Sequence, residues 1–380
     1  MYGRALYFGA PYRAADGVTT DSQVLFDRTG KNSGNLLIGY ALHSQIDAQI
    51  VSISPEHRPA DRNFDFIAIA AANFLFSGFD FGPFADLVEE IDLPCIMVGL
   101  GAQAPSTGGF PEISPGTKRF VQAVAARCHS IGVRGAFTAE VLARLGIKNV
   151  ELTGCPSFYL HSPAELSAAF AQRKGNPSKV SLNASRNVMA HSANPAKMKD
   201  VERRMYQLCR ASDAQFVLQS EHEEMRILAS SSEEEELKLA ARIGATLGWD
   251  DISDEEIRAF VKSKFHIYFD IDEWRASISR CSFSAGSRFH GNLLALLSGV
   301  PAHVICHDTR TKELCELGGV PHSLLQDISS DFTIAELQQA TNIGKFIRTH
   351  ADNYSGYRRF LERNGIPHTL AKPEPYASVG

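Results

Sequence analysis

Continuous apolar runs of strand length alternate with stretches of helical spacing along this chain, and that alternation restricts the folds open to it. Phe66–Ala70 and Pro94–Gly101 are such runs, and Phe84–Ile91 between them carries its apolar residues at helical spacing. Strands that are apolar on both faces occur in parallel sheets with helices packed on each side. The pattern continues as far as Ala302–Cys306. We therefore predict an α/β fold built on parallel sheets.

The length of the chain and one break in the pattern predict two domains. A chain of 380 residues exceeds what one ordinary hydrophobic core fills, and Gly175-Asn176-Pro177 interrupts the alternation. We expect an N-terminal domain over residues 1–170 and a C-terminal domain over residues 176–330. Helices within 331–365 are expected to brace the two domains. The stretch 366–380 contains three prolines and is expected to be a loose tail.

Bulk composition narrows the class of protein. The formal net charge is −5 and the sequence pI is about 6.2, so the chain lacks the positive field that attracts nucleic acid, and we expect no nucleic-acid partner. No apolar stretch is long enough to span a bilayer, and the first residues do not form a signal peptide. The seven cysteines contain no C-x-x-C pair, which fits a reducing compartment. We expect a cytoplasmic enzyme without a metal, because no His, Asp and Glu set has ligand spacing.

Two serine–glutamate pairs predict helix starts in the second half. Ser230 with Glu233, and Ser253 with Glu256, have the spacing of a capping box, in which each side chain accepts a hydrogen bond from a free backbone amide. The acidic run that begins at Glu233 is therefore interpreted as the first turn of a helix rather than as an interaction tract.

The strongest candidate site follows a buried strand that ends at Gly286. Arg288 and His290 are expected in the short turn before an apolar helix over Gly291–Ser298. Ligands of open parallel sheets bind beyond the carboxyl ends of the strands, and the free amides of the helix start would face that region. An arginine, a histidine and these amides form an anion site with a proton donor. The alternative is structural, with Arg288 paired to a carboxylate and His290 capping the helix.

Three other segments hold weaker candidates. Arg134 also follows a strand and precedes a helix, and a surface arginine is an equal alternative. The loop with Asn32, Gly34 and Asn35 precedes a helix but lacks the P-loop pattern, so a plain turn explains it as well. Arg310 lies after the last apolar strand and could reach the same anion, while the neighbouring Asp308 could cap the next helix.

These segments, in this order, resemble the polysaccharide pyruvyl transferase family from about Asn32 to Leu317. The anchor is a G-x-R-x-H turn at Gly286–His290, followed by Gly299-Val300-Pro301 and then by Asp308-Thr309-Arg310. Further support comes from four shorter segments, Asn32–Asn35, Phe64–Ile67, Val98–Gly101 and Val133-Arg134.

The resemblance implies two Rossmann-like domains that face each other across a cleft, as in GT-B glycosyltransferases. It also implies transfer of a pyruvyl group from phosphoenolpyruvate to a sugar diol, which yields a pyruvate ketal and phosphate without a cofactor or a metal. The acceptor would be a polysaccharide sugar, free or lipid-linked, with peripheral contact at the inner membrane in the latter case. The oligomeric state is left open.

By the same resemblance, Arg134, Arg288 and His290 match the catalytic positions. His290 is then the proton donor, and bound anions would raise its pKa. The C-terminal domain would bind phosphoenolpyruvate and the N-terminal domain the acceptor. The expected substrate-binding residues are Ser287, Gly291, Asn292, Arg310, Asn32, Gly34, Asn35 and Asn73.

The chain departs from the family pattern at Gly135, at Cys155 and at Asn73, all on the expected acceptor side. A polar or acidic residue often follows the arginine, Gly-Asp-Pro is common where Gly154-Cys155-Pro156 stands, and a Gly-rich stretch is common where this chain has Ala71-Ala72-Asn73. Two rival functions remain open at this point. One is a GT-B glycosyltransferase whose nucleotide sugar is held by an acidic segment such as Glu221–Glu223 or Asp270–Asp272. The other is a non-catalytic protein that binds anionic glycans.

Overall fold

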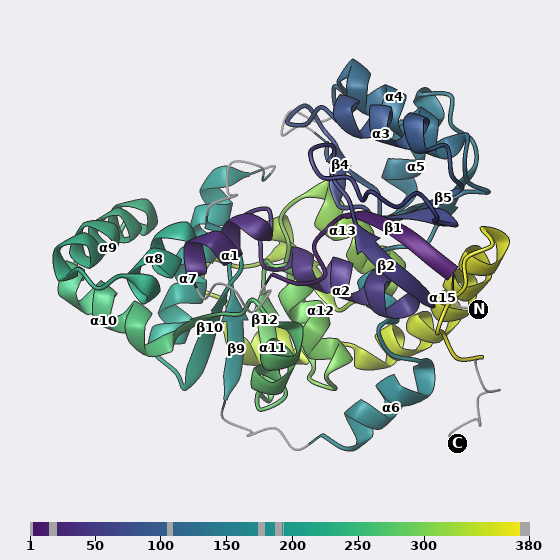
Figure 1. The fold of residues 1–380 in the computed structure, drawn as a ribbon. Coiled ribbons are helices and arrows are strands. Elements are labelled where there is room, and N and C mark those ends of the chain that lie inside the picture. Colours follow the sequence, from purple (N-terminus) through teal and green to yellow (C-terminus); the bar gives the residue numbers. More distant parts are fainter. Residues whose placement is uncertain are drawn as a thin grey trace, which may run out of the picture.

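The computed structural model describes residues 3–14, 21–104, 109–173, 179–186, 192 and 194–372. The predicted domain break at Gly175–Pro177 and the tail beyond residue 372 lie outside these ranges. Two parallel sheets, each covered by helices on both faces, form two lobes (Figure 1). The α/β class and the GT-B-like pair of facing Rossmann-like domains are thereby confirmed. Among the described helices, none is both long and apolar enough to cross a membrane.

The N-terminal half contains a four-stranded parallel sheet of order β2-β1-β3-β5, which a bridge from Leu100 to Val133 links to the pair β7-β8. A short ribbon of β4 and β6 lies beside it. The strands are β1 (Gly3–Gly9), β2 (Ala48–Ser52), β3 (Phe66–Ala70), β4 (Asn73–Leu75), β5 (Cys95–Val98), β6 (Gly101–Ala102), β7 (Ile131–Val133) and β8 (Val150–Leu152). The helices are α1 (Ser22–Arg28), α2 (Asn35–Gln45), α3 (Gly82–Ile91), α4 (Pro115–Ala125), α5 (Ala136–Arg144), the 3-10 turn η1 (Pro156–Tyr159) and α6 (Pro163–Ala171).

The C-terminal half contains a six-stranded parallel sheet of order β11-β10-β9-β12-β13-β14. Counted from β9, this is the order 3-2-1-4-5-6 of doubly wound nucleotide-binding domains. The strands are β9 (Val180–Asn183), β10 (Ala214–Leu218), β11 (Phe265–Ile267), β12 (Phe283–Gly286), β13 (Ala302–Cys306) and β14 (His322–Leu324). The helices are α7 (Pro195–Arg210), α8 (His222–Ala229), α9 (Glu233–Leu247), α10 (Asp254–Lys264), α11 (Ile271–Ile278), α12 (Phe289–Leu297), α13 (Thr309–Gly318), α14 (Ile334–Gln339) and α15 (Ile343–Arg363).

Alternate residues of one strand belong to different cores, which explains why the strands are apolar throughout. Phe66 and Ala68 of β3 share a cluster with α2, whereas Ile67 and Ile69 share one with α3 and α4. The cluster that contains α2 also contains α12 of the second half and Tyr357 of α15. The two halves therefore share a hydrophobic core below the space between them.

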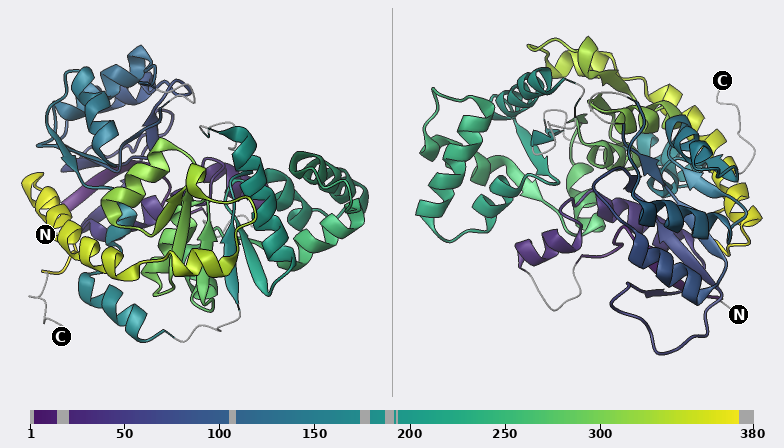
Figure 2. Two further views of the ribbon diagram at one scale, coloured as in Figure 1. Left: turned by 180° about the vertical axis from the view of Figure 1, so that it is seen from behind. Right: turned by 90° about the horizontal axis from the view of Figure 1, so that it is seen from above.

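The C-terminal helix α15 contacts both halves (Figure 2, left, yellow). Near its middle, Asn353 donates a hydrogen bond to the carbonyl oxygen of Leu317 at 2.8 Å. Near its end, the Tyr357 hydroxyl donates to Gln45 at 2.8 Å. Residues 366–369, expected to be loose, are held in place, since Asp47 N–H donates to the carbonyl oxygen of Pro367 at 2.9 Å and Ile366 is buried.

The predicted helix starts are partly correct. Ser253 and Glu256 form the expected capping box at α10. The cap of α9 is Ser232 and not Ser230, which instead ends α8. Helix α12 begins at Phe289, so His290 lies in its first turn rather than in the loop before it.

Candidate active site

A cavity of about 690 Å³ lies between the two halves. Most of its lining residues follow the carboxyl ends of strands: Asn73 follows β3, Arg134 follows β7, Ser220 follows β10, and Arg288 follows β12. In both sheets, neighbouring strands whose connections run in opposite directions meet here, at β1/β3 and at β9/β12. Such points are where doubly wound sheets bind ligands. Five basic and two acidic side chains line the cavity, namely Arg28, Lys31, Arg134, Arg288 and Arg310 with Asp27 and Asp308.

Arg134 presents a guanidinium that is buried but incompletely bonded. Its Nε donates to the carbonyl oxygen of Gly99 at 2.8 Å, while its Nη2 has no hydrogen-bond partner within the described part of the chain. Burial lowers the pKa of Arg134, and Arg310 lowers it further. Gly101 makes room for the side chain, because a Cβ there would lie 2.8 Å from the Arg134 Cδ. The protein thus keeps a cation at this cavity at a cost to its own stability.

Arg288 is anchored on both sides of its guanidinium. Its Nε donates to the carbonyl oxygen of Ala184 at 2.8 Å, and its Nη2 contacts Ser220 and forms an ion pair with the fully buried Glu221. The carboxylate pairing considered as the structural alternative is therefore present. The arginine nevertheless lines the cavity, so the ion pair positions it there.

Arg310 reaches the same cavity from the first turn of α13. Its Nη2 lies 3.1 Å from the Asp308 carboxylate, and Asp308 caps the helix by accepting from the Thr311 N–H at 2.7 Å. Burial alone would raise the pKa of Asp308, but Arg310, His307 and Thr311 together hold it well below its usual range. Asp308 is thus a permanent carboxylate that orients Arg310.

His290 is not among the residues that line the cavity, and only 9% of its surface is exposed. Its Nε2 is 3.6 Å from the Cys155 thiol. Burial lowers the pKa of His290 well below its ordinary value, and Arg134 and Arg310 lower it further. The imidazole is therefore neutral while only the protein's own charges surround it. An anion held by the same arginines would offset their effect and raise the pKa.

A match to a known protein family identifies the family of this chain. The model of the polysaccharide pyruvyl transferase family matches residues 32–309. The chain belongs to this family. The predicted resemblance is thereby confirmed, and with it membership of a family named for transferring pyruvyl groups to polysaccharides. No curated protein sequence matches the chain.

Solved structures similar to this pyruvyl transferase family member share little sequence with it. MnaA of S. aureus, determined with UDP, has 11% identity and a TM-score of 0.47, with 99% of this chain and 100% of that chain covered. HepE of Anabaena, determined with UDP and glucose, has 11% identity and a TM-score of 0.43, with 96% and 98% covered. MurG of Acinetobacter baumannii has 10% identity and a TM-score of 0.35, with 93% and 94% covered.

The loop before α2 brings further predicted residues to the cavity of the family member. Asn32 and Asn35 line it, as does Asn73 from the other side. Gly34 lies behind the lining, where a Cβ would approach Gln219 Oε1 to 2.4 Å and the Cβ of His290 to 3.3 Å. Glycine at this position lets the N-terminal loop pack directly on α12.

Three predicted substrate-binding residues take internal places instead. The Ser287 hydroxyl donates to Glu202 at 3.0 Å, and Ser287 is buried and does not line the cavity. Asn292 is fully buried and bonds to Asn183 and Ser284. Gly291 packs where a Cβ would lie 2.7 Å from Gln219. These residues hold the strand–helix turn that carries Arg288.

Two departures from the family pattern have local explanations. A Cβ at Gly135 would lie 2.0 Å from Glu313 Cγ, so the glycine admits this carboxylate from α13. Glu313 accepts hydrogen bonds from the backbone N–H and the hydroxyl of Thr138, at 3.0 and 3.1 Å, and thereby caps α5 across the two halves. Cys155 places a neutral thiol against His290, because burial raises the pKa of that thiol.

Other lining residues were not predicted from the sequence. Lys31 adopts a left-handed backbone (φ 59°), which is unusual for a residue with a side chain. Five phenylalanines within eleven positions form one wall, and their density was the signal that could have revealed them. They are Phe74, Phe76, Phe79, Phe81 and Phe84.

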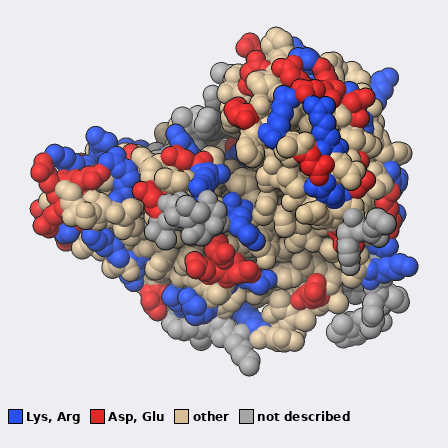
Figure 3. Space-filling view, in the orientation of Figure 1, with Lys and Arg blue, Asp and Glu red and all other residues tan. Residues whose placement is uncertain are grey.

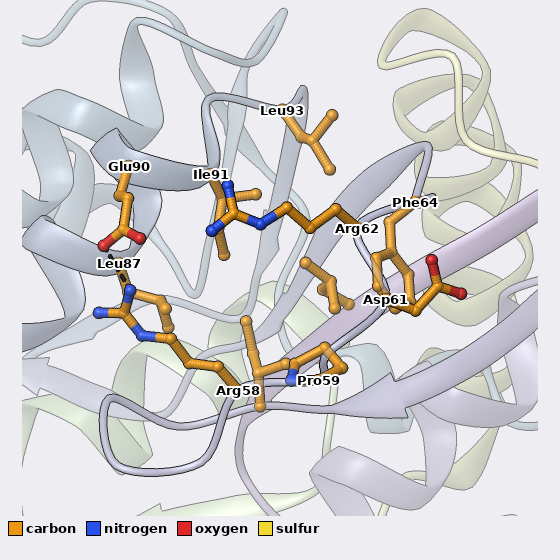
Figure 4. A pocket seen from close by; sticks show the side chains of 11 residues that line it. Arg58, Pro59, Asp61, Arg62, Phe64, Leu87, Glu90, Ile91 and Leu93 are labelled. Carbon is orange, nitrogen blue, oxygen red and sulfur yellow. Dashed lines mark hydrogen bonds and ion pairs between the residues drawn. The ribbon is translucent and has the colours of Figure 1, made fainter.

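A second, smaller pocket of about 140 Å³ lies elsewhere in the N-terminal half (Figure 4). Apolar side chains from β1 and α3 line it, and Arg58 pairs with Glu90 at its side. None of the predicted site residues belongs to it. Lys and Arg are interspersed with Asp and Glu on the face drawn in Figure 3.

Proposed function

We propose that this protein transfers the pyruvyl group of phosphoenolpyruvate to two hydroxyls of a polysaccharide sugar, forming a cyclic ketal and releasing phosphate. The observation that supports this is the buried guanidinium of Arg134, whose Nη2 lacks a partner in the described chain and which shares a cavity with Arg288 and Arg310. A desolvated cation without a bonded anion is costly, and an anionic ligand would remove that cost.

Phosphoenolpyruvate suits this cavity because it carries both a carboxylate and a phosphate. Planar guanidinium groups bind both kinds of oxyanion with two parallel hydrogen bonds. Arg134 comes from one half of the protein, and Arg288 and Arg310 come from the other. A ligand with two anionic groups would therefore bridge the two halves.

Binding of phosphoenolpyruvate would also protonate His290, the proton donor of the proposed reaction. The pKa of His290 is low because of burial and of the adjacent arginines. The negative charges of phosphoenolpyruvate oppose those arginines, so the imidazole takes up a proton as the donor binds. Protonation is thus confined to the complex in which the proton is needed.

The reaction then proceeds with each proton assigned. His290 gives its proton to the CH2 carbon, which becomes the methyl group, and the adjoining carbon becomes cationic. One sugar hydroxyl attacks that carbon and returns its proton to His290. The bond from the carbon to the phosphate oxygen breaks, and Arg134 and Arg288 stabilise the departing phosphate. The second hydroxyl closes the ring, and its proton leaves with phosphate.

Phosphate release from phosphoenolpyruvate with a panel of sugar acceptors tests the proposal, with mass analysis for the added pyruvate. His290→Gln is expected to abolish release while the protein still unfolds at the wild-type temperature. His303→Gln is the matched control, because His303 is a buried histidine of the same half whose pKa is lowered by burial and by His322 rather than by the arginines of the cavity. Stabilisation by a nucleotide sugar but not by phosphoenolpyruvate, together with no release for any acceptor, would overturn the assignment.

A further inference from the structure

One wall of the cavity is aromatic, which a small polyanion does not require. The segment from β4 to α3 contributes this phenylalanine wall, with Phe74 in β4, Phe84 in α3, and Phe76, Phe79 and Phe81 between the two elements. Phe79 is 48% exposed and is one of three large hydrophobic residues exposed among those described, with Val24 and Leu152. Burial of the exposed part of this ring would be favourable, so its exposure inside a cavity points to a ligand.

The phenylalanine wall is held rigidly from behind. Phe79 meets Phe76 edge to face, with ring centroids 4.9 Å apart, and Phe81 at 5.6 Å. Phe81 in turn stacks on Phe120 of α4 at 5.4 Å, and Phe120 is fully buried. The exposed ring is therefore fixed by the core, and a ligand that packs on it pays little ordering entropy.

A polar group beside the wall is left with an open acceptor. Asn73 Nδ2 donates to Gln103 Oε1 at 2.6 Å, and both residues line the cavity, Asn73 from β4 and Gln103 from the position directly after β6. Asn73 Oδ1 is shielded from solvent and has no hydrogen-bond partner among residues 3–14, 21–104 and the later described ranges. A buried carbonyl oxygen without a donor costs free energy, and a ligand hydroxyl would satisfy it.

An aromatic face next to a hydroxyl acceptor fits a pyranose ring. Such a ring has a C–H-rich face for stacking and hydroxyls at its edge. We propose that the phenylalanine wall and Asn73 form the subsite for the acceptor sugar ring, with its C–H face against Phe79. One hydroxyl would donate to Asn73 Oδ1 once the half-buried side chain turns this atom toward the cavity. This inference rests on the proposed function, since it assigns the second substrate of the same cavity. The arginines across the cavity then face the hydroxyls that are to be pyruvylated.

Separate measurement of the KM for each substrate tests the subsite. Phe79→Ala is expected to raise the acceptor KM roughly 2- to 12-fold, which corresponds to an aromatic contact, and to leave the phosphoenolpyruvate KM unchanged. Phe79→Tyr keeps the ring and is expected to retain the wild-type value. Leu152→Ala, at a residue 52% exposed outside this cavity, is the matched control. An unchanged acceptor KM in Phe79→Ala, or an equal rise in both KM values, would overturn the proposal.

The hydroxyl contact has its own test. The binding affinities of deoxy analogues of the acceptor, each lacking one hydroxyl, are measured for the wild type and for Asn73→Leu. One analogue is expected to bind the wild type about 10-fold more weakly than the parent sugar, and Asn73→Leu is expected to bind the two alike. If Asn73→Leu still distinguishes every analogue as the wild type does, Asn73 does not contact the sugar.

Failure of the proposed function and failure of the subsite give different results. If no sugar triggers phosphate release, the pyruvyl transfer is refuted. Sugar binding is then measured directly by saturation-transfer NMR with the wild type and Phe79→Ala. Weaker binding by the variant than by the wild type supports the subsite, whereas equal binding by the two, or no binding by the wild type, refutes it.

Discussion

Two arginines of one cavity are expected to affect stability in opposite directions. Arg134 is buried and forms no ion pair with the residues that the structure describes, whereas Arg288 is paired with the fully buried Glu221. Replacement of each arginine by methionine removes a similar volume and the same charge. We expect Arg134→Met to stabilise the protein and Arg288→Met to destabilise it, although both are expected to abolish binding of phosphoenolpyruvate.

The magnitudes follow from what each substitution leaves behind. Removal of an uncompensated buried cation recovers several kcal/mol of desolvation. Against this, the carbonyl oxygen of Gly99 loses its bond from Arg134, which costs about 1–3 kcal/mol. A net gain of about 1–3 kcal/mol remains. Arg288→Met leaves the Glu221 carboxylate buried without its ion-pair partner, which costs about 3–5 kcal/mol of stability.

Urea and thermal unfolding of the two variants, with and without phosphoenolpyruvate, provide the assay. Addition of Glu221→Gln to Arg288→Met is expected to recover most of the loss, because no unpaired carboxylate then remains buried. Equal destabilisation by Arg134→Met and Arg288→Met would refute the reasoning. So would a phosphoenolpyruvate-induced rise in the unfolding temperature of Arg134→Met that equals the wild-type rise.

Three further predictions concern individual residues. Burial raises the pKa of Glu202 to about 8, so the folded state keeps a proton that the unfolded state releases near 4.5. Stability should therefore fall between these pH values by up to about 1.4 kcal/mol per pH unit, and urea unfolding of Glu202→Gln at pH 5 and pH 8 should lack this component. Cys155→Asp should raise the pKa of His290 by roughly 1–3 units in an NMR titration, whereas the neutral Cys155→Ser should not. Gly135→Ala should destabilise the protein by about 1–3 kcal/mol in calorimetry through overlap with Glu313, and adding Glu313→Ala should remove that overlap but not the lost cap.

The fold was predictable because hydrophobic patterning carries it. Runs such as Phe66–Ala70 are apolar on both faces, and the structure buries alternate residues in two cores. The first residue of each helix was harder to predict than the fold. Each of the serines 230, 231 and 232 has a glutamate three residues later, and the sequence does not reveal which serine the tertiary contacts select as the cap.

At the candidate site, position along the chain predicted more than side-chain direction did. Arg134, Arg288 and Arg310 follow strand ends and line the cavity. Ser287 is the neighbour of Arg288 in the sequence but points to Glu202. A turn sends adjacent side chains to different sides, and one sequence does not state which side faces the ligand. The phenylalanine wall was missed because apolar residues are ordinarily assigned to the core.

The cap that Glu313 provides for α5 makes the proposed donor site dependent on both lobes being assembled. The helix start that follows Arg134 takes its carboxylate from α13, the helix that also carries Arg310. If the lobes separated, α5 would lose its capping group. Arg134 would also move away from Arg310, with which it is proposed to share a ligand. Any opening that admits a sugar must therefore keep Glu313 bonded to the start of α5. An opening that breaks this contact would separate the arginines of the cavity.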